Sequence, residues 1–356
     1  MSSQVWLKSP AFDLTWILSP AFFASLGVVL FRSDAAAVSP FVWLVFILGI
    51  DVAHVYATLY RTYWNPEERL SYQTALWVIP VASWLAGTLL YGVSPLLFWR
   101  GLAYLAAFHF VRQQYGFFCI YAGRNGENVT WLDKAALYLA MVFPLVYWHT
   151  HPRNFEWFVP GDFFFLPFAF LTPFTLLIWA TAWIAYGWKE LKRGGVFNWP
   201  KNLILLGTAL SWNVGIVLLN SDLAFTVTNV VSHGVPYLAL LWWYGQSYAS
   251  RNREKVFWRG ITWKRLFTGF GCFFYLGSLL VLAYLEEGLW DGLVWRERGN
   301  IFPWFSGLPH IQLKGTLAWL VPLLTLPQVT HYLIDGFIWR VSGPSASFNF
   351  LEREPT

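Results

Sequence analysis

Long apolar segments recur along the chain, and they restrict its possible folds more than any other feature of the sequence. A helix that crosses a bilayer needs about 20 apolar residues. Ten segments meet this requirement: 13–31, 38–60, 72–93, 95–122, 131–149, 164–188, 202–220, 222–247, 265–287 and 315–339. Hydrophobic residues make up 57% of the chain and charged residues 12%, which differs from the usage of soluble domains. The sequence predicts an all-α, polytopic membrane bundle of about ten helices, forming a single integral-membrane domain over residues 1–356.

Basic residues are distributed unevenly between the segments that connect these spans. With the N-terminus inside, seventeen Lys and Arg residues fall in inner segments and five in outer segments. Because basic loops are retained on the cytoplasmic side, we expect both termini in the cytoplasm and the chain in a bacterial inner membrane, surrounded by lipids. The net charge of +5 belongs to these loops, so no nucleic-acid partner is expected. The longest outer loop, 288–314, is expected at the membrane interface, where it could act as a lid.

Sulfur-containing residues are scarce. The two cysteines, Cys119 and Cys272, lie within apolar segments, so no disulfide framework is expected. With only two methionines as well, soft ligands for Cu(I) are nearly absent. The first apolar segment follows a short polar N-terminus without a clear cleavage site, and it is interpreted as a retained span.

Four histidines lie inside predicted spans: His54, His109, His233 and His331. Ionisable groups within a bilayer are costly, face the protein interior and by default indicate a functional site. All four histidines are on even-numbered spans, which run in the same direction. At about 1.5 Å per residue, they lie roughly 9 to 20 Å from the inner ends of their spans. We therefore expect them to share one layer of the membrane.

Polar side chains flank these histidines three or four residues away, on the same helix face. They are Asp51, Thr58, Arg112, Gln113, Asn229, Tyr237, Gln328 and Asp335. A metal-bound imidazole usually donates its second N–H to a carboxylate, a carbonyl or water, so Asp51 and Asp335 are expected either to orient histidines or to bind metal directly. Arg112 is expected to neutralise one of them. Pro236 and Pro327 each free a backbone carbonyl one turn earlier, which is tolerated where protein surrounds the helix.

Several types of site contain buried histidines. A single one is usually an interhelical hydrogen-bonding residue, whereas four on four helices, with two Asp and one Arg, favour a metal or haem site over a proton path or packing. No His-Glu-x-x-His motif is present, so the common zinc-protease arrangement is absent. Imidazoles with carboxylates suit non-haem Fe(II), although imidazole also suits zinc and copper. The other histidines, His149, His151 and His310, are expected in solvated or interfacial outer loops.

Four short segments, 49–54, 108–110, 232–237 and 326–340, resemble the histidine segments of the Brp/Blh carotene dioxygenases. These are polytopic bacterial and archaeal membrane enzymes that split β-carotene to retinal with non-haem iron held by histidines. The resemblance implies metal-ligand roles for the four histidines inside the spans. Two positions differ from the family pattern: Tyr237 stands where the family has a further histidine, and Asp51 precedes His54 whereas the family's Asp follows the histidine.

The preferred hypothesis is a membrane-embedded, iron-dependent oxidase or oxygenase that uses O₂ and an apolar substrate, such as a carotenoid or lipid, entering from the bilayer. Its expected catalytic residues are Asp51, Arg112, Tyr237 and Asp335. One alternative is a b-type haem protein with two facing histidines as axial ligands. Another is a proton-coupled transporter with Asp51, His54, Arg112 and Asp335 as the relay. The sequence leaves the substrate, the metal and the oligomeric state open.

Overall fold

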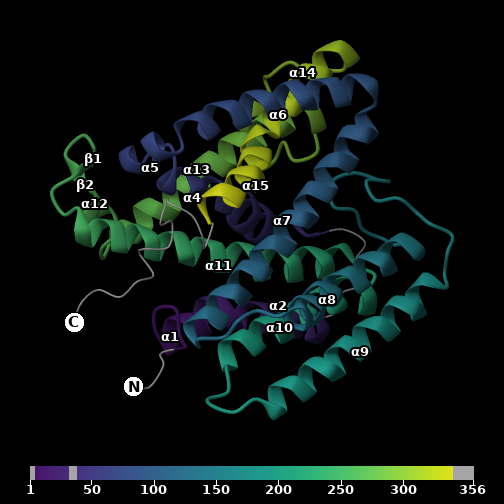
Figure 1. Cartoon of the computed structure of the whole chain (residues 1–356). Helices are drawn as coiled ribbons and strands as arrows, with labels where there is room; N and C mark the ends of the chain where they lie inside the picture. The colour runs from purple at the N-terminus through teal and green to yellow at the C-terminus, as the bar shows by residue number, and fades with distance from the viewer. Residues whose placement is uncertain (1–4, 32–37, 340–356) are drawn as a thin grey trace. The chain divides into compact units, whose positions relative to one another are not determined.

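The computed structural model describes residues 5–31 and 38–339, and most of these residues are helical (Figure 1). The extended elements in this part of the chain are β1 (Val256–Trp258) and β2 (Ile261–Thr262), which pair as a small antiparallel hairpin. The prediction of an all-α fold is confirmed. Arg340, the last residue of the segment that resembles the dioxygenase family, lies outside the described residues.

Each of the ten predicted spans coincides with helical structure. The first five correspond to α1 (Pro10–Asp13), η1 (Leu14–Leu18) and α2 (Ser19–Leu30); α3 (Pro40–Val42), η2 (Trp43–Val52) and α4 (Ala53–Arg61); α6 (Gln73–Val93); α7 (Pro95–Arg124); and α8 (Trp131–Thr150). The last five correspond to α9 (Leu171–Lys192); α10 (Trp199–Trp212) and η3 (Asn213–Leu218); α11 (Asp222–Arg251); α13 (Gly271–Trp290) and η4 (Asp291–Trp295); and α14 (Lys314–Leu324) and α15 (Leu326–Ile338). The short elements between them are α5 (Pro66–Ser71), α12 (Trp263–Leu266) and the 3-10 helix η5 (Pro303–Phe305), while η1 to η4 are π-helical.

Six helical stretches in the described part of the chain are long and apolar enough to cross a membrane. They are 10–30, 40–61, 73–93, 199–218, 222–251 and 271–295. A seventh is obtained if α14 and α15, which meet at a bend of 43°, form one broken span. These helices support a membrane protein. The helices α7, α8 and α9 lie at predicted positions but are less apolar, so the count of ten spans stays a prediction.

The chain forms two compact units, each built from two separate stretches of sequence. Unit 1 comprises Met1–Val42 and Ala103–Pro236, and unit 2 comprises Trp43–Leu102 and Tyr237–Thr356. The helices α7 and α11 each contribute residues to both units. Whether the whole chain is a single domain stays a prediction.

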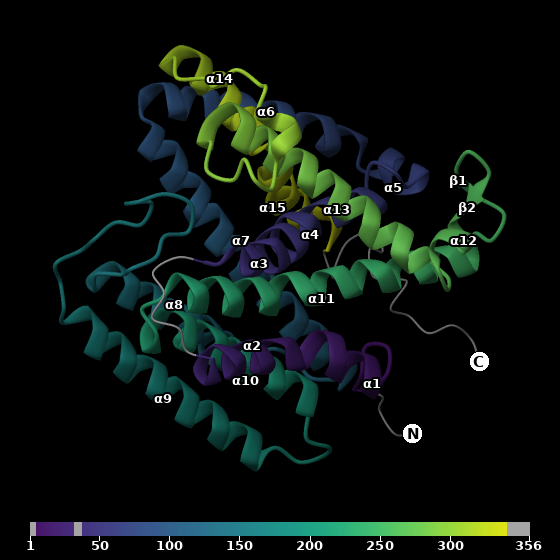
Figure 2. The same cartoon turned by 180° about the vertical axis from the view of Figure 1, so that it is seen from behind.

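Within unit 1, α8 packs against α9 and α10, and α10 packs against α2 (Figures 1 and 2). The helix α8 begins with a capping box: Asp133 N–H donates to the Thr130 hydroxyl, and the Asp133 carboxylate accepts from Thr130 N–H. Such a box satisfies amide groups that have no partner within the helix. The Asp133 carboxylate also lies 2.6 Å from Lys189 Nζ on α9. The start of α8 therefore fixes the neighbouring helix as well.

Within unit 2, α6 packs against α14 and α15, and α4 packs against α13 and α15 (Figures 1 and 2). Leu76, Ile334 and Ile338 form a buried cluster between α6 and α15. The remaining faces of α6 expose large apolar side chains, including Trp77 and Leu89, as expected of a helix in contact with lipid. This packing places the middle of α4 beside α15, where two of the predicted site histidines lie.

Close packing of α6 on α14 depends on Gly87. A Cβ atom at this position would lie 2.8 Å from Pro322 Cβ and 3.1 Å from a ring carbon of Phe98. We expect Gly87→Ala to destabilise the fold by about 1–3 kcal/mol, the usual cost of overpacking. Gly92→Ala is the matched control on the same helix, because nothing lies within 4 Å of its added Cβ. Thermal unfolding in detergent should show a lower Tm for Gly87→Ala alone; equal Tm values would contradict the close approach.

Two of the predicted spans have wrong boundaries. The segment 164–188 does not begin as a helix, because α9 starts at Leu171. The second is the span 265–287: α13 starts at Gly271, and the helical structure continues through η4 to Trp295. The first part of the predicted outer loop 288–314 is therefore helical, and the role of this segment as a lid stays a prediction.

Candidate metal centre

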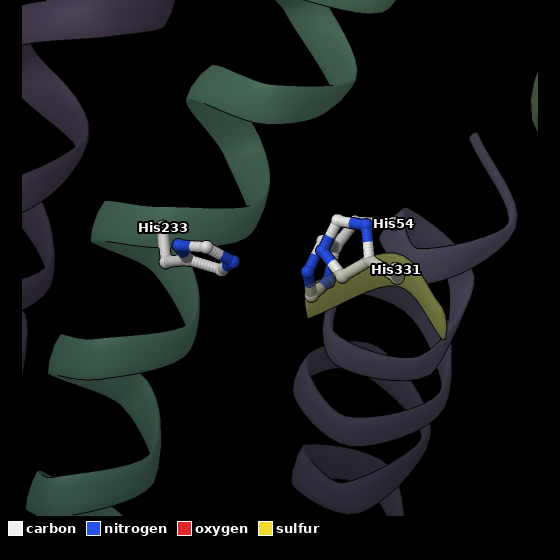
Figure 3. A group of neighbouring side chains, drawn as sticks. All are labelled: His54, His233 and His331. Atoms are coloured by element: carbon white, nitrogen blue, oxygen red, sulfur yellow. The ribbon is translucent and has the colours of Figure 1, made fainter. Parts of the chain in front are cut away.

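In unit 2, α4 and α15 bring His54 and His331 together. Their ring centroids are 5.0 Å apart at an angle of 80°, and each side chain is only 1% exposed. A ring nitrogen of each lies within 4.8 Å of the other (Figure 3). Two nitrogens bound to one ion at about 2.1 Å each can be no more than about 4.2 Å apart. The two imidazoles are thus close to the separation that a shared metal requires.

A backbone carbonyl fixes the tautomer of His54. Its Nδ1 lies 3.1 Å from the carbonyl oxygen of Ile50. A carbonyl can only accept a hydrogen bond, so the proton is on Nδ1. The lone pair of the neutral ring is therefore on Nε2, the nitrogen that would face a metal.

A chain of hydrogen bonds fixes the tautomer of His331. Tyr237 donates its hydroxyl proton to Asp335 Oδ1 at 2.8 Å, so the tyrosine oxygen can only accept from Thr58 Oγ1, 2.8 Å away. The single proton of Thr58 is then used. With an ionised Asp335 at the end of the chain, His331 Nδ1, 2.7 Å from Thr58 Oγ1, is the donor in its turn. The relay from His331 through Thr58 and Tyr237 to Asp335 again leaves the lone pair on Nε2.

Asp335 adds a carboxylate to the two imidazoles. Its side chain is 9% exposed, and its Oδ1 lies 3.7 Å from His331 Nδ1. Two histidines and one carboxylate are the donor set of many non-haem Fe(II) oxygenases. A hydrogen bond from the second ring nitrogen to a carbonyl or to an outer relay is also the usual support of metal-binding histidines. In unit 2 the two imidazoles are therefore the donors that face one another, and Asp335 supports His331 from its Nδ1 side.

Arg61 is the cation beside Asp335, with which it interacts electrostatically. It is completely buried, donates to the carbonyl of Ile338 at 2.5 Å, and lies 3.7 Å above the ring of Trp339. From the sequence, Arg61 was expected only to be one of the seventeen basic residues of the inner segments. Its spacing gave a usable signal, since Arg61 follows His54 by seven residues and therefore shares its helix face.

Arg112 was predicted to neutralise a carboxylate of the site. In unit 1 its guanidinium donates to the Tyr138 hydroxyl at 3.0 Å and lies 4.9 Å from the ring centroid of Tyr115. These contacts give Arg112 aromatic partners. Within the described part of unit 2, Arg61 is the cation that neutralises Asp335.

The Asp51 carboxylate lies beyond hydrogen-bond distance of the His54 ring. Its Oδ1 is 4.0 Å from His54 Nδ1, whose proton goes to Ile50, and its side chain is 37% exposed. A second carboxylate, that of Glu286 on α13, lies near enough to Asp51 for the two like charges to repel each other. Glu286 is 5% exposed and accepts a hydrogen bond from the Tyr56 hydroxyl at 2.7 Å. Glu286 was not predicted as a site residue, because it lies near the end of an apolar segment without a histidine.

In unit 1, His109 of α7 lies against His233 of α11. Their ring centroids are 4.9 Å apart at 77°, and both side chains are buried. The ring of Phe110 stacks on His233 with a centroid separation of 3.8 Å. Figure 3 shows His233 on its helix. Unit 1 thus contains a second pair of imidazoles in edge contact.

The backbone before Pro236 is held by two glutamines. Proline has no N–H to donate to the carbonyl four residues earlier, which here belongs to Ser232. Gln114 Nε2 donates to that carbonyl at 3.4 Å, and Gln113 Nε2 donates to the next one, that of His233, at 3.2 Å. The freed carbonyl expected from the sequence therefore has a protein partner, and the turn that carries His233 is fixed.

The remaining histidines make local contacts. His149 lies in the last turn of α8, not in a loop as predicted; its Nδ1 donates to the Leu145 carbonyl at 2.6 Å, and its Nε2 accepts from the Tyr104 hydroxyl at 2.6 Å. His151 stacks on Tyr147. His310 is exposed, as predicted, and its Nε2 donates to a backbone carbonyl.

The structure groups the predicted site residues by unit. Unit 2 contains Asp51, His54, Tyr237, His331 and Asp335, and unit 1 contains His109, Arg112 and His233. Comparison with protein-family models, curated proteins and solved structures finds no match for this chain. Its function is therefore argued from the geometry of its own residues.

Proposed function

We propose that the chain is a membrane-embedded, iron-dependent oxidoreductase that uses O₂ to oxidise an apolar substrate, a carotenoid or another lipid. The observation that carries the proposal is the matched state of His54 and His331. Both buried rings hold their proton on Nδ1 through a defined partner, and both leave the lone pair on Nε2. Packing alone does not require this arrangement.

His54 and His331 would hold the ion in unit 2, and Asp335 would either orient His331 through the relay or bind the ion directly. Non-haem iron bound to such donors supplies a site at which O₂ can bind and be activated. Thr58 and Tyr237 keep His331 in the ligating tautomer, and Arg61 compensates the charge of Asp335. His109 and His233 are proposed as further ligands from the sequence pattern.

An apolar pocket beside these residues supports an apolar substrate. It has a volume of about 300 Å³ and reaches Thr58 and His331. Most of its wall is hydrophobic, including Val55, Leu59, Leu323 and Leu326. Leu323 is 47% exposed, so the pocket meets the surface next to the lipid-facing helix α6. A substrate dissolved in the bilayer could enter there without crossing water.

The haem alternative is less consistent with the geometry. A bis-histidine haem needs room for the porphyrin plane between its two axial imidazoles. The rings of His54 and His331 are in edge contact at 5.0 Å, and those of His109 and His233 at 4.9 Å, which leaves no such space within either pair. The transporter alternative uses the same relay, because hydrogen bonds from His331 to Asp335 could also conduct protons. The metal content of the purified protein distinguishes a transporter from the proposed iron enzyme.

The proposal also includes the membrane in which the protein lies and the type of oxidation that it catalyses. The distribution of basic residues favours the cytoplasmic membrane of a bacterium, with both termini in the cytoplasm. The resemblance to the Brp/Blh dioxygenases favours oxidative cleavage among the possible oxidations.

Purified protein should contain about one iron per chain and show no haem Soret band, because imidazole and carboxylate donors favour non-haem iron. Elemental analysis and an absorption spectrum of the detergent-solubilised chain make the test. A strong Soret band with stoichiometric haem would replace this proposal with a cytochrome. Metal-free protein that still moves protons across vesicles would replace it with a transporter.

A further inference from the structure

Thr330 on α15 has a hydroxyl group without a protein partner. The residue is 9% exposed, and its Oγ1 makes no hydrogen bond among the described residues. A threonine within a helix usually donates to the carbonyl four residues earlier. The helical threonines that do so here include Thr150, Thr175, Thr181 and Thr228. Thr330 departs from this pattern, as does Thr88 on α6, and a buried unsatisfied hydroxyl requires an explanation. Of these two threonines, Thr330 lines a pocket.

The Thr330 side chain lines the apolar pocket beside His331. Three other hydroxyl side chains line the same pocket, and each has a protein partner. Tyr56 donates to Glu286, Tyr63 donates to the Leu76 carbonyl, and Thr58 belongs to the relay from His331. Thr330 is thus the lining hydroxyl that is left to bond a molecule in the pocket.

We propose that this pocket binds the oxygen-bearing end of a slender apolar molecule, a long-chain or terpenoid alcohol or ketone, with Thr330 as its hydrogen-bond partner. A hydroxyl can both donate and accept, so either oxygen function suits it. The volume of about 300 Å³ is at the lower limit of small-molecule pockets, which fits one end of such a molecule. The rest of the chain would lie toward the exposed side of Leu323 and the bilayer.

This inference rests on the proposed function, because it names the substrate class of the same site. Thr330 and His331 are consecutive residues that line one pocket. The oxygen-bearing end would therefore be held beside the histidine that is proposed to bind iron.

The test compares farnesol with farnesene, its hydrocarbon counterpart without the hydroxyl group. Binding is measured by competition with labelled farnesol on the full chain in lipid nanodiscs, without added iron. The wild-type protein should prefer farnesol. Thr330→Val should weaken farnesol binding by about 3- to 10-fold, the effect of one hydrogen bond, and leave farnesene binding unchanged. Thr330→Ser keeps the hydroxyl and should keep the preference.

Thr181→Val is the matched control, since Thr181 is an exposed helical threonine that bonds its own backbone. It should change neither affinity. Equal binding of both probes to the wild-type protein would overturn the inference, as would an unchanged preference in a folded Thr330→Val variant. Iron analysis on the same preparations separates the two proposals: absence of iron would reject the metal centre without altering the binding result.

Discussion

His331→Ala should lower the iron bound per chain by at least about tenfold, and His54→Ala should do the same. Loss of a ligand harms a metal site more than loss of an outer hydrogen-bond partner, which typically costs about 10–100-fold in affinity. His109→Ala and His233→Ala are expected to have the same effect, from the sequence pattern. Metal content is measured on folded, purified variants after equilibration with limiting Fe(II).

The control for these variants is His310→Ala, because His310 is exposed and bonds a backbone carbonyl. It should retain iron. Tyr237→Phe tests the relay: it removes the donor to Asp335 and the acceptor for Thr58, so iron binding should weaken by about 10–100-fold. Folded variants in which all four buried histidines are dispensable for metal would leave interhelical hydrogen bonding as the better explanation of these residues.

Asp335→Asn distinguishes the two possible roles of the carboxylate. If Asp335 only accepts from Tyr237, the amide oxygen of Asn can still accept, and iron should remain with weaker affinity. If Asp335 binds the ion directly, the iron should be largely lost. Both outcomes are read from the same metal titration.

The helices could be predicted from the sequence because the length of an apolar segment is a local property. All ten segments contain helical structure. The boundaries were less predictable, since hydropathy does not distinguish an apolar loop from a helix. Residues 164–170 are apolar and include Pro167, yet α9 begins only at Leu171.

The four histidines could be identified from the sequence as buried polar residues, but their tautomers and hydrogen-bond partners could not be predicted from their spacing. The tautomer of His331 depends on Thr58, which is 273 residues away, and on the contact between Tyr237 and Asp335, which are 98 residues apart. Such pairings arise from tertiary packing. The role of Arg61 could not be predicted for a related reason: a basic residue at the end of a span has the same sequence pattern whether it faces water or a buried carboxylate.

Buried charges in unit 1 join three segments of the chain. Lys201 Nζ on α10 lies 2.6 Å from Glu127 Oε2, in the segment after α7, and 2.9 Å from Glu190 Oε1 on α9. Arg193 also contacts Glu127. Asn198, just before α10, donates to the other oxygen of Glu127 at 2.8 Å. The Lys201 side chain is 1% exposed, so the ion pairs are shielded from water.

Lys201→Met should destabilise the protein by about 3–5 kcal/mol, because removing one partner of a buried ion pair leaves its carboxylates uncompensated. The double variant Lys201→Met with Glu190→Gln should recover part of this loss. Lys255→Met is the control: Lys255 pairs with Glu67 at an exposed position, where ion pairs contribute little. Thermal unfolding in detergent should show a large fall in Tm for Lys201→Met and little change for Lys255→Met. Equal shifts would contradict the stabilising role of the buried network.

The same network should set the acid stability of the fold. Burial by itself would raise the pKa of Glu127, but hydrogen bonds from Arg193, Lys201, Asn125 and Asn198 lower it from 4.5 to about 2. A carboxylate with a lowered pKa in the folded state stabilises that state above its unfolded pKa, and this contribution is lost as the pH falls from 4.5 toward 2. Glu127→Gln should remove this part of the pH dependence of Tm. An unchanged Tm profile between pH 5 and pH 2 in that variant would show that other carboxylates govern acid unfolding.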